Sequence, residues 1–158
     1  MNDKIAKLAK LLGSKKNKDY GAKFENKVLL FESKNDLVLP PDLAAYFKIL
    51  DSATDTLDAN LYQFYTIDQF KNLKTDLAHW EGIPNYKGIL DTLNENETCY
   101  VFADYMFHMF TYAIRLYKKT SDVNEIYIIC GDKYKVIANS FSDFLNLYFE
   151  NSIELQFT

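Results

Sequence analysis

The first fifty residues carry apolar side chains at intervals of three and four positions, which is the spacing of one face of an α-helix. Three groups share this spacing: Ile5, Leu8 and Leu12; Phe24, Val28 and Phe31; and Leu43, Tyr46, Phe47 and Leu50. The first group predicts a short amphipathic helix ending near Gly13, and the second a helix over about 23–34. The third predicts a helix beginning at Pro41, because proline fits the first turn, where its missing N–H breaks no hydrogen bond.

Near Tyr62 the period shortens to two residues, which is typical of strands. The aromatic-rich segment 62–67 predicts a strand, 68–77 a helix, and 79–94, with two glycines and a proline, a long loop. Four more strands are predicted over 98–104, 111–117, 125–130 and 134–138. Gly131-Asp132 has the composition of a hairpin turn between the last two.

A final helix is predicted from Ser140, which is a suitable N-cap residue, with Asp143 in the first turn. Its wide apolar stripe should pack on the sheet, and the alternating segment 153–157 predicts a last edge strand. The expected fold is α+β, with N-terminal helices, an antiparallel sheet of at least four strands and a C-terminal helix packed on the sheet. We expect one domain over 23–158, preceded by an amphipathic lead helix and connector over 1–22.

The spacing of glycine, cysteine and histidine excludes several kinds of site. No two glycines are closer than six residues, so neither a phosphate-binding loop nor a dinucleotide fingerprint can be written. Cys99, Cys130, His79 and His108 form none of the close pairs that metal sites use, and no cofactor is expected. Cys99 and His108 could act as nucleophile and base, but both lie in segments with the pattern of strands and nothing orients them, so an enzyme is disfavoured.

Charge is distributed unevenly along the 158 residues. The net charge is −4, but residues 1–27 hold eight Lys against three acids, so residues 28–158 carry −9. An acidic body disfavours direct binding to nucleic acid and favours a basic protein as the partner. No run of about 18 apolar residues offers a membrane span, and Met1–Lys16 lacks the apolar core of a secretory signal, so a cytoplasmic location is expected.

Two acidic features are candidate partner contacts. Asp51, Asp55 and Asp58 follow the third predicted helix, either as an acidic surface for a cation or basic partner or as a solvated loop. Asp104 interrupts an apolar run and is followed by Tyr105. A carboxylate in that position either caps the end of a strand or faces a partner, because burying an isolated charge is costly.

Three segments in order resemble the SUKH superfamily, which includes fungal glucan-synthesis regulators and many bacterial immunity proteins. They are Leu39-Pro40-Pro41-Asp42-Leu43 followed by Tyr46-Phe47; Val101 to Met106 followed by Tyr112-Ala113-Ile114; and Ile137 to Leu145. The resemblance covers about 23–151. The sequence departs from the family pattern at Ile49-Leu50-Asp51-Ser52, where members commonly carry an Asn-Gly pair.

The resemblance implies a binding module and brings no catalytic residue with it. The leading hypothesis is an intracellular immunity protein that binds and blocks a toxin domain, a basic nuclease, without chemistry. Acidic residues would steer the encounter, and exposed tyrosines would anchor the complex. The alternative is a scaffold that docks onto signalling or envelope-synthesis proteins, as the fungal relatives are thought to do.

Overall fold

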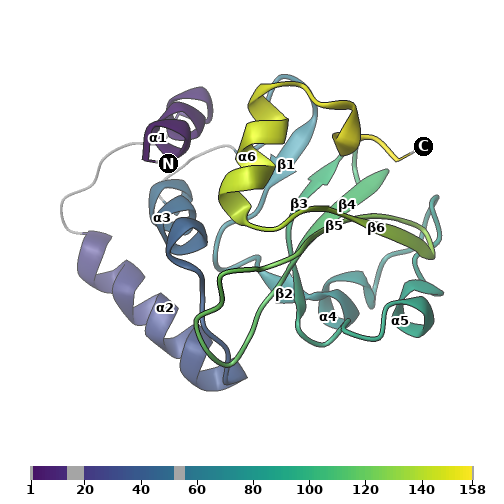
Figure 1. Ribbon diagram of the computed structural model, residues 1–158, viewed down its shortest axis with the longest axis horizontal. Coiled ribbons are helices and arrows are strands. Elements are labelled where there is room, and N and C mark those ends of the chain that lie inside the picture. The colour runs from purple at the N-terminus through teal and green to yellow at the C-terminus, as the bar shows by residue number, and fades with distance from the viewer. Residues whose placement is uncertain (1, 14–19, 52–55, 158) are drawn as a thin grey trace.

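A computed structural model describes residues 2–13, 20–51 and 56–157 (Figure 1). Its helices are α1 (Asn2–Leu11), α2 (Tyr20–Asn35), α3 (Pro41–Leu50), α4 (Leu73–Leu77), α5 (Ile89–Thr92), α6 (Phe141–Phe149) and the 3-10 helix η1 (Ile153–Leu155). Its strands are β1 (Tyr62–Phe64), β2 (Lys71–Asn72), β3 (Cys99–Tyr105), β4 (Phe110–Arg115), β5 (Ile126–Cys130) and β6 (Lys133–Ala138). The predicted α+β class is confirmed.

The strands form one antiparallel sheet in the order β1-β3-β4-β5-β6. Both β1 and β2 pair with β3, at different points along it, while β4 pairs along its whole length. Consecutive strands from β3 to β6 are neighbours, which is the meander that the alternating sequence pattern predicts. Gly131 has a φ of 64°, a left-handed conformation that glycine adopts easily, in the turn between β5 and β6.

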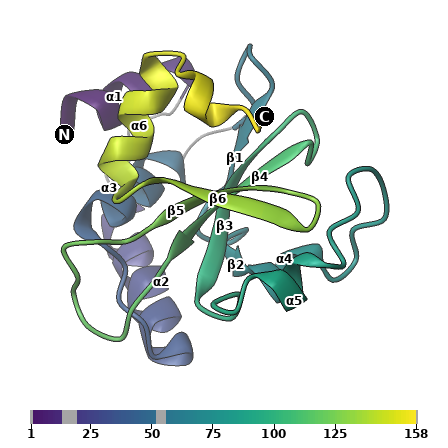
Figure 2. The ribbon, with the colours of Figure 1, turned by 45° about the vertical axis from the view of Figure 1, so that its right-hand side comes forward.

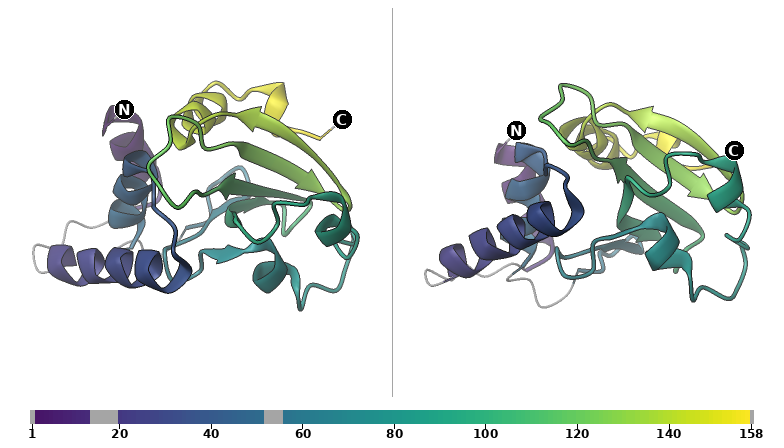
Figure 3. Two further views of the ribbon diagram at one scale, coloured as in Figure 1. Left: turned by 60° about the horizontal axis from the view of Figure 1, so that its bottom comes forward. Right: turned by 90° about the horizontal axis from the view of Figure 1, so that it is seen from below.

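Helices cover the two faces of the sheet (Figure 3). On the face that we call the α6 face, Phe102 packs against Phe144 of α6 at a centroid distance of 4.9 Å. Helices α1 and α3 extend the same core. On the opposite face, the α4 face, a second core joins Val101 and Ile129 of the sheet to Leu73 of α4 and Ile89 of α5. The α4 face carries the candidate site described below.

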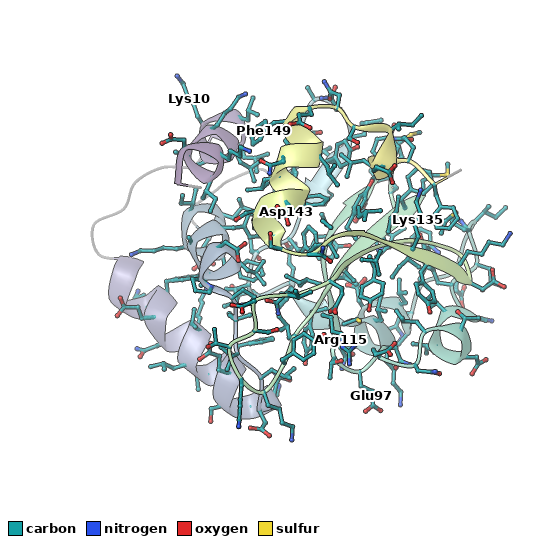
Figure 4. The ribbon with its side chains drawn as sticks, viewed as in Figure 1. Lys10, Glu97, Arg115, Lys135, Asp143 and Phe149 are labelled. Carbon is teal, nitrogen blue, oxygen red and sulfur yellow. The ribbon has the colours of Figure 1, made fainter. Side chains whose placement is uncertain are left out.

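Helix α6 docks as the sequence predicts. The Ser140 Oγ accepts a hydrogen bond from the backbone N–H of Asp143 at 3.0 Å, and Phe141 and Phe144 are fully buried. Near its end, Phe149 lies between α6 and α1 (Figure 4), where Lys7 Nζ is 4.5 Å from the ring centroid. The predicted C-terminal helix packed on the sheet is therefore confirmed.

The N-terminal helix shares the core of the domain. Ile5, Leu8 and Leu12 are buried in the same cluster as α3 and α6, and Gly13, with a φ of 66°, ends the helix. The proposed division between 1–22 and 23–158 stays a prediction, with residues 14–19 outside the described part of the chain.

Three predicted elements differ in the structure. The helix expected over 68–77 spans only Leu73–Leu77. The side chain of Asn72 caps its start by accepting a hydrogen bond from the Thr75 N–H at 2.9 Å, and the residues before it, Lys71–Asn72, pair with β3 as the strand β2. The predicted loop 79–94 contains α5. The tail forms η1 instead of an edge strand, because Ser152 caps a short turn and Leu155 C=O accepts a hydrogen bond from the hydroxyl of Tyr112 at 2.7 Å.

Candidate functional site

A bulge in β3 decides which face of the sheet Asp104 occupies. The β3–β4 register shifts between Val101 and Ala103, so Phe102 and Ala103 both belong to the core on the α6 face. Without that shift, strict alternation from Phe102 would point Asp104 to the α6 face as well. Instead, Asp104 lies on the α4 face, where its carboxylate meets Tyr65 and His108.

Asp104 belongs to a group of five side chains that we call the His108 cluster: Tyr65, Asp76, Trp80, Asp104 and His108. The Tyr65 hydroxyl donates to Asp104 Oδ2 at 2.8 Å and lies 3.3 Å from His108 Nε2. The other oxygen of Asp104, Oδ1, accepts from the backbone N–H of His108 at 3.3 Å. Asp104 is only 4% exposed, so these internal hydrogen bonds take the place of water around its oxygens.

The imidazole of His108 is held on several sides. Its Nδ1 is 3.6 Å from Asp104 Oδ2, and its Nε2 is 3.8 Å from Asp76 Oδ2 on α4. The indole of Trp80 stacks on it at a centroid distance of 4.5 Å, and Trp80 is itself fixed by a 2.9 Å hydrogen bond from Nε1 to Pro84 C=O. These contacts join the turn after β3 to α4 and the segment after it.

Two carboxylates beside one imidazole change its titration. Burial lowers the pKa of His108, but the combined attraction of the Asp76 and Asp104 carboxylates outweighs burial and raises that pKa above its ordinary value of 6.5. Burial together with the same two carboxylates raises the pKa of Tyr65 far above its usual range, which keeps its hydroxyl protonated as a donor. The two aspartates therefore favour the charged form of the imidazole.

The backbone above the cluster has an unusual conformation. Met106, Phe107 and His108, the turn between β3 and β4, have φ values of 46°, 52° and 68°. A left-handed conformation costs a residue with a side chain roughly 1–2 kcal/mol. The hydrogen bond from His108 N–H to Asp104 and a 2.6 Å hydrogen bond from the Tyr86 hydroxyl to His108 C=O hold the turn in this shape.

The turn presents apolar side chains to solvent. Phe107 is 72% exposed, and Met106, Met109 and the neighbouring Leu61 are exposed to a lesser extent. Met106 N–H donates to Leu61 C=O at 3.0 Å, which joins the two loops at one end of the sheet (Figure 2). We call these four side chains the turn surface. The turn surface is a small apolar projection, and the charged and aromatic side chains of the His108 cluster support the turn that carries it.

The comparisons with known proteins place the chain in a family. Residues 25–147, most of the chain, match the model of the SMI1 / KNR4 family (SUKH-1). The chain belongs to this family. A search of curated proteins and a search of solved structures gave no significant match. The resemblance seen in the sequence is therefore confirmed at the level of the family.

The SUKH motifs meet in the folded chain. Asp42, in the motif that begins α3, accepts hydrogen bonds at 2.9 Å from both the backbone N–H and the hydroxyl of Ser142, in the motif that begins α6. Tyr46 packs on Phe141 with ring centroids 4.5 Å apart. Residues of the first and third motifs thus hold α3 and α6 together in this chain.

The predicted contact residues lie in different surroundings. Asp51 is at the end of α3, its side chain 3% exposed and its Oδ1 3.2 Å from Lys27 Nζ. Asp58 accepts hydrogen bonds from the backbone N–H groups of Asn60 and Tyr62 and from the hydroxyl of Tyr148. Asp55 lies outside the described residues. Within the described chain, Asp51 and Asp58 therefore already serve the fold, and their contact with a partner stays a prediction.

Asp104 and Tyr105 lie beside the turn surface. Asp104 is buried beneath it in the His108 cluster, and Tyr105 is half-buried, its ring 4.9 Å from that of Tyr62. Tyr105 also lines a pocket with Asn60, Ile153 and others. Although adjacent in β3, the two side chains lie on opposite faces of the sheet, Asp104 on the α4 face and Tyr105 against the core of the α6 face. Asp51 pairs with Lys27 of α2 instead.

Sequence reasoning did not find the other members of the site. His108 was expected in a strand, but it lies in the turn and faces Asp104 four residues earlier. The signal for this is the polar pair Asp104 and His108 at that spacing within an apolar run. Asp76, Trp80 and Phe107 carried no comparable signal, because their roles depend on the bulge and on the packing of α4.

The described residues contain neither a metal-ligating cluster nor a membrane-spanning helix. Within residues 2–13, 20–51 and 56–157, no group of three or more His, Cys, Asp or Glu is arranged to hold a metal ion. None of the described helices has the length and apolar character needed to cross a bilayer. Cys99 lies buried in β3, and burial raises the pKa of its thiol to about 12, which keeps it in the unreactive form.

Proposed function

We propose that this SMI1/KNR4-family chain is an intracellular immunity protein. It binds a toxin domain that is delivered by a neighbouring cell and blocks it by covering its active site, without catalysis. The observation that carries the proposal is the family match over residues 25–147. The sequence motifs resemble the SUKH superfamily, in which bacterial immunity proteins are frequent.

The charge of the chain supports a basic target. Residues 28–158 carry a net charge of −9, and this region contains the sheet and the helices on both of its faces. An acidic surface steers a basic partner and raises the rate of encounter. A nuclease domain fits this requirement because it needs basic residues to bind the phosphates of nucleic acid. We therefore propose a basic nuclease domain as the target.

The alternative is a scaffold that docks onto signalling or envelope-synthesis proteins. Both functions use a binding surface, and neither uses a catalytic residue. They differ in the partner. An immunity protein protects a cell from one toxin domain, whereas a scaffold gives no protection.

Survival of a bacterial host tests the proposal. The proposal predicts that a toxin domain is encoded directly before the gene for this chain. That domain is induced with and without co-expression of the chain, and colonies are counted. We expect the toxin to kill the host and the chain to restore growth by several orders of magnitude. An unrelated acidic protein of similar size is the control for charge alone. Killing that the chain does not relieve would reject the immunity function and favour the scaffold.

A further inference from the structure

The turn surface differs from the other exposed apolar side chains in how it is supported. Leu30 of α2 is 69% exposed, about as much as Phe107, but it lies on the outer side of a regular helix. Phe107 instead lies in the middle of three consecutive left-handed residues, which are unfavourable without support. The chain therefore holds an aromatic side chain out in solvent at a conformational cost.

The support comes from buried groups on three other segments. Asp104 of β3 binds the turn backbone through the His108 N–H, and Tyr86 binds it through the His108 C=O. The ring of His108 is fixed by Trp80 and by Asp76 of α4. A turn whose backbone is held in this way loses little conformational freedom on binding, and a preorganised turn binds more tightly than a mobile one.

The charges below the turn indicate the kind of partner. Asp76 and Asp104 place two carboxylates at its base, both beside the imidazole of His108. Even with His108 protonated, one negative charge remains. An apolar tip above a negative base fits an apolar pocket with lysine or arginine at its rim, because complementary charges favour the correct partner and disfavour others.

We propose that the turn surface, Leu61, Met106, Phe107 and Met109, is the surface through which this chain contacts its toxin domain, with Phe107 inserted into an apolar pocket that has basic residues at its rim. This inference rests on the proposed immunity function. It assigns the anchor to a phenylalanine, whereas the sequence alone pointed to tyrosines. His108 is a positioning residue, since it fixes the turn and does not itself touch the partner.

The test compares two alanine variants of equally exposed side chains, Phe107→Ala and Leu30→Ala. Affinity for the toxin domain encoded beside the chain is measured by isothermal titration calorimetry, and circular dichroism and thermal unfolding check the fold of each variant. Phe107→Ala should weaken binding at least about 30-fold, as the loss of a central interface anchor does. Leu30→Ala, on a helix at another side of the molecule (Figure 2), should change it by less than about threefold.

Each outcome bears on one of the two proposals. If the wild-type chain binds the toxin domain and Phe107→Ala binds equally well, the contact surface is wrong but the immunity function stands. If Leu30→Ala is the variant that weakens binding, the contact surface lies on α2 and this inference is overturned. If the wild-type chain does not bind, the immunity function fails and the contact surface fails with it. Should Phe107→Ala lose its fold, Phe107→Gln, which keeps a long side chain, replaces it with the same expectation.

Discussion

The rings of Trp80 and His108 are stacked, with centroids 4.5 Å apart and planes inclined by 17°. Trp80 is the single tryptophan of the sequence, so the intrinsic indole fluorescence of the protein comes from this stack. A protonated imidazole in contact with an indole quenches its fluorescence more strongly than a neutral one. The protonation state of His108 can therefore be read directly from the intact protein.

Fluorescence should follow the raised pKa of His108. Emission from Trp80 is expected to rise with pH, with a midpoint above the ordinary histidine value of 6.5, because Asp76 and Asp104 favour the charged imidazole. The measurement is emission at fixed excitation from about pH 5.5 to about pH 9. Asp76→Asn, which removes one of the two carboxylates, should lower the midpoint. A transition at or below the ordinary value, or one unchanged by Asp76→Asn, would show that the carboxylates do not control His108.

The same group should make stability depend on pH. A histidine with a raised pKa in the folded state contributes stability that is fully present below its unfolded value, 6.5, and is lost as pH rises through the folded pKa. The urea midpoint of wild type should therefore exceed that of His108→Gln most at about pH 6, and the difference should shrink towards about pH 9. His79→Gln, the same substitution at an exposed position, is the matched control, and its free energy of unfolding should stay within about 0.5 kcal/mol of wild type.

The docking of α6 on the sheet predicts large effects at two buried phenylalanines. Phe141 and Phe144 are fully buried, and their truncation leaves cavities between α6 and β3. Phe141→Ala and Phe144→Ala should each lower the free energy of unfolding by about 3–5 kcal/mol. Urea denaturation at constant pH measures this. Ile153→Ala, at an exposed position nearby in the chain, should stay within about 0.5 kcal/mol of wild type.

Asp58 should matter for stability regardless of any partner. Its Oδ1 accepts two backbone hydrogen bonds at 2.8 Å, and its Oδ2 accepts the hydroxyl of Tyr148 on α6. Asp58→Ala leaves these donors without their acceptor and should cost about 1–3 kcal/mol in urea denaturation. Glu97→Ala, at an exposed acid (Figure 4), is the charge-matched control and should change stability by about 0.5 kcal/mol or less. Equal urea midpoints for the two variants would contradict the structural role of Asp58.

Most of the fold could be predicted because local patterns and tertiary packing agree. The apolar stripes of α1, α2 and α3, the strands β3 to β6 and the Ser140 cap all lie where their spacing indicates. Prediction failed where a single capping side chain determines the start or the type of an element. Asn72 starts α4 five residues later than the periodicity suggests, and Ser152 turns the tail into η1.

The candidate site was predictable only in part. Asp104 was recognisable as a charge in an apolar run, and its burial beneath the turn follows from the bulge after Val101. A bulge has no reliable sequence signal here, since it depends on how β3 and β4 fit together. The partners Asp76 and Trp80 come from a segment whose secondary structure was partly mispredicted, so their meeting with His108 could not be foreseen.

Binding of the purified chain to the purified toxin domain encoded beside it tests the immunity function most directly. Stopped-flow kinetics at two ionic strengths give the association and dissociation rates separately. We expect a one-to-one complex whose association slows markedly at higher salt while its dissociation changes less, because an acidic protein steers a basic partner through charge. The absence of a complex at micromolar concentrations would contradict the immunity function, and association rates independent of salt would contradict its electrostatic basis.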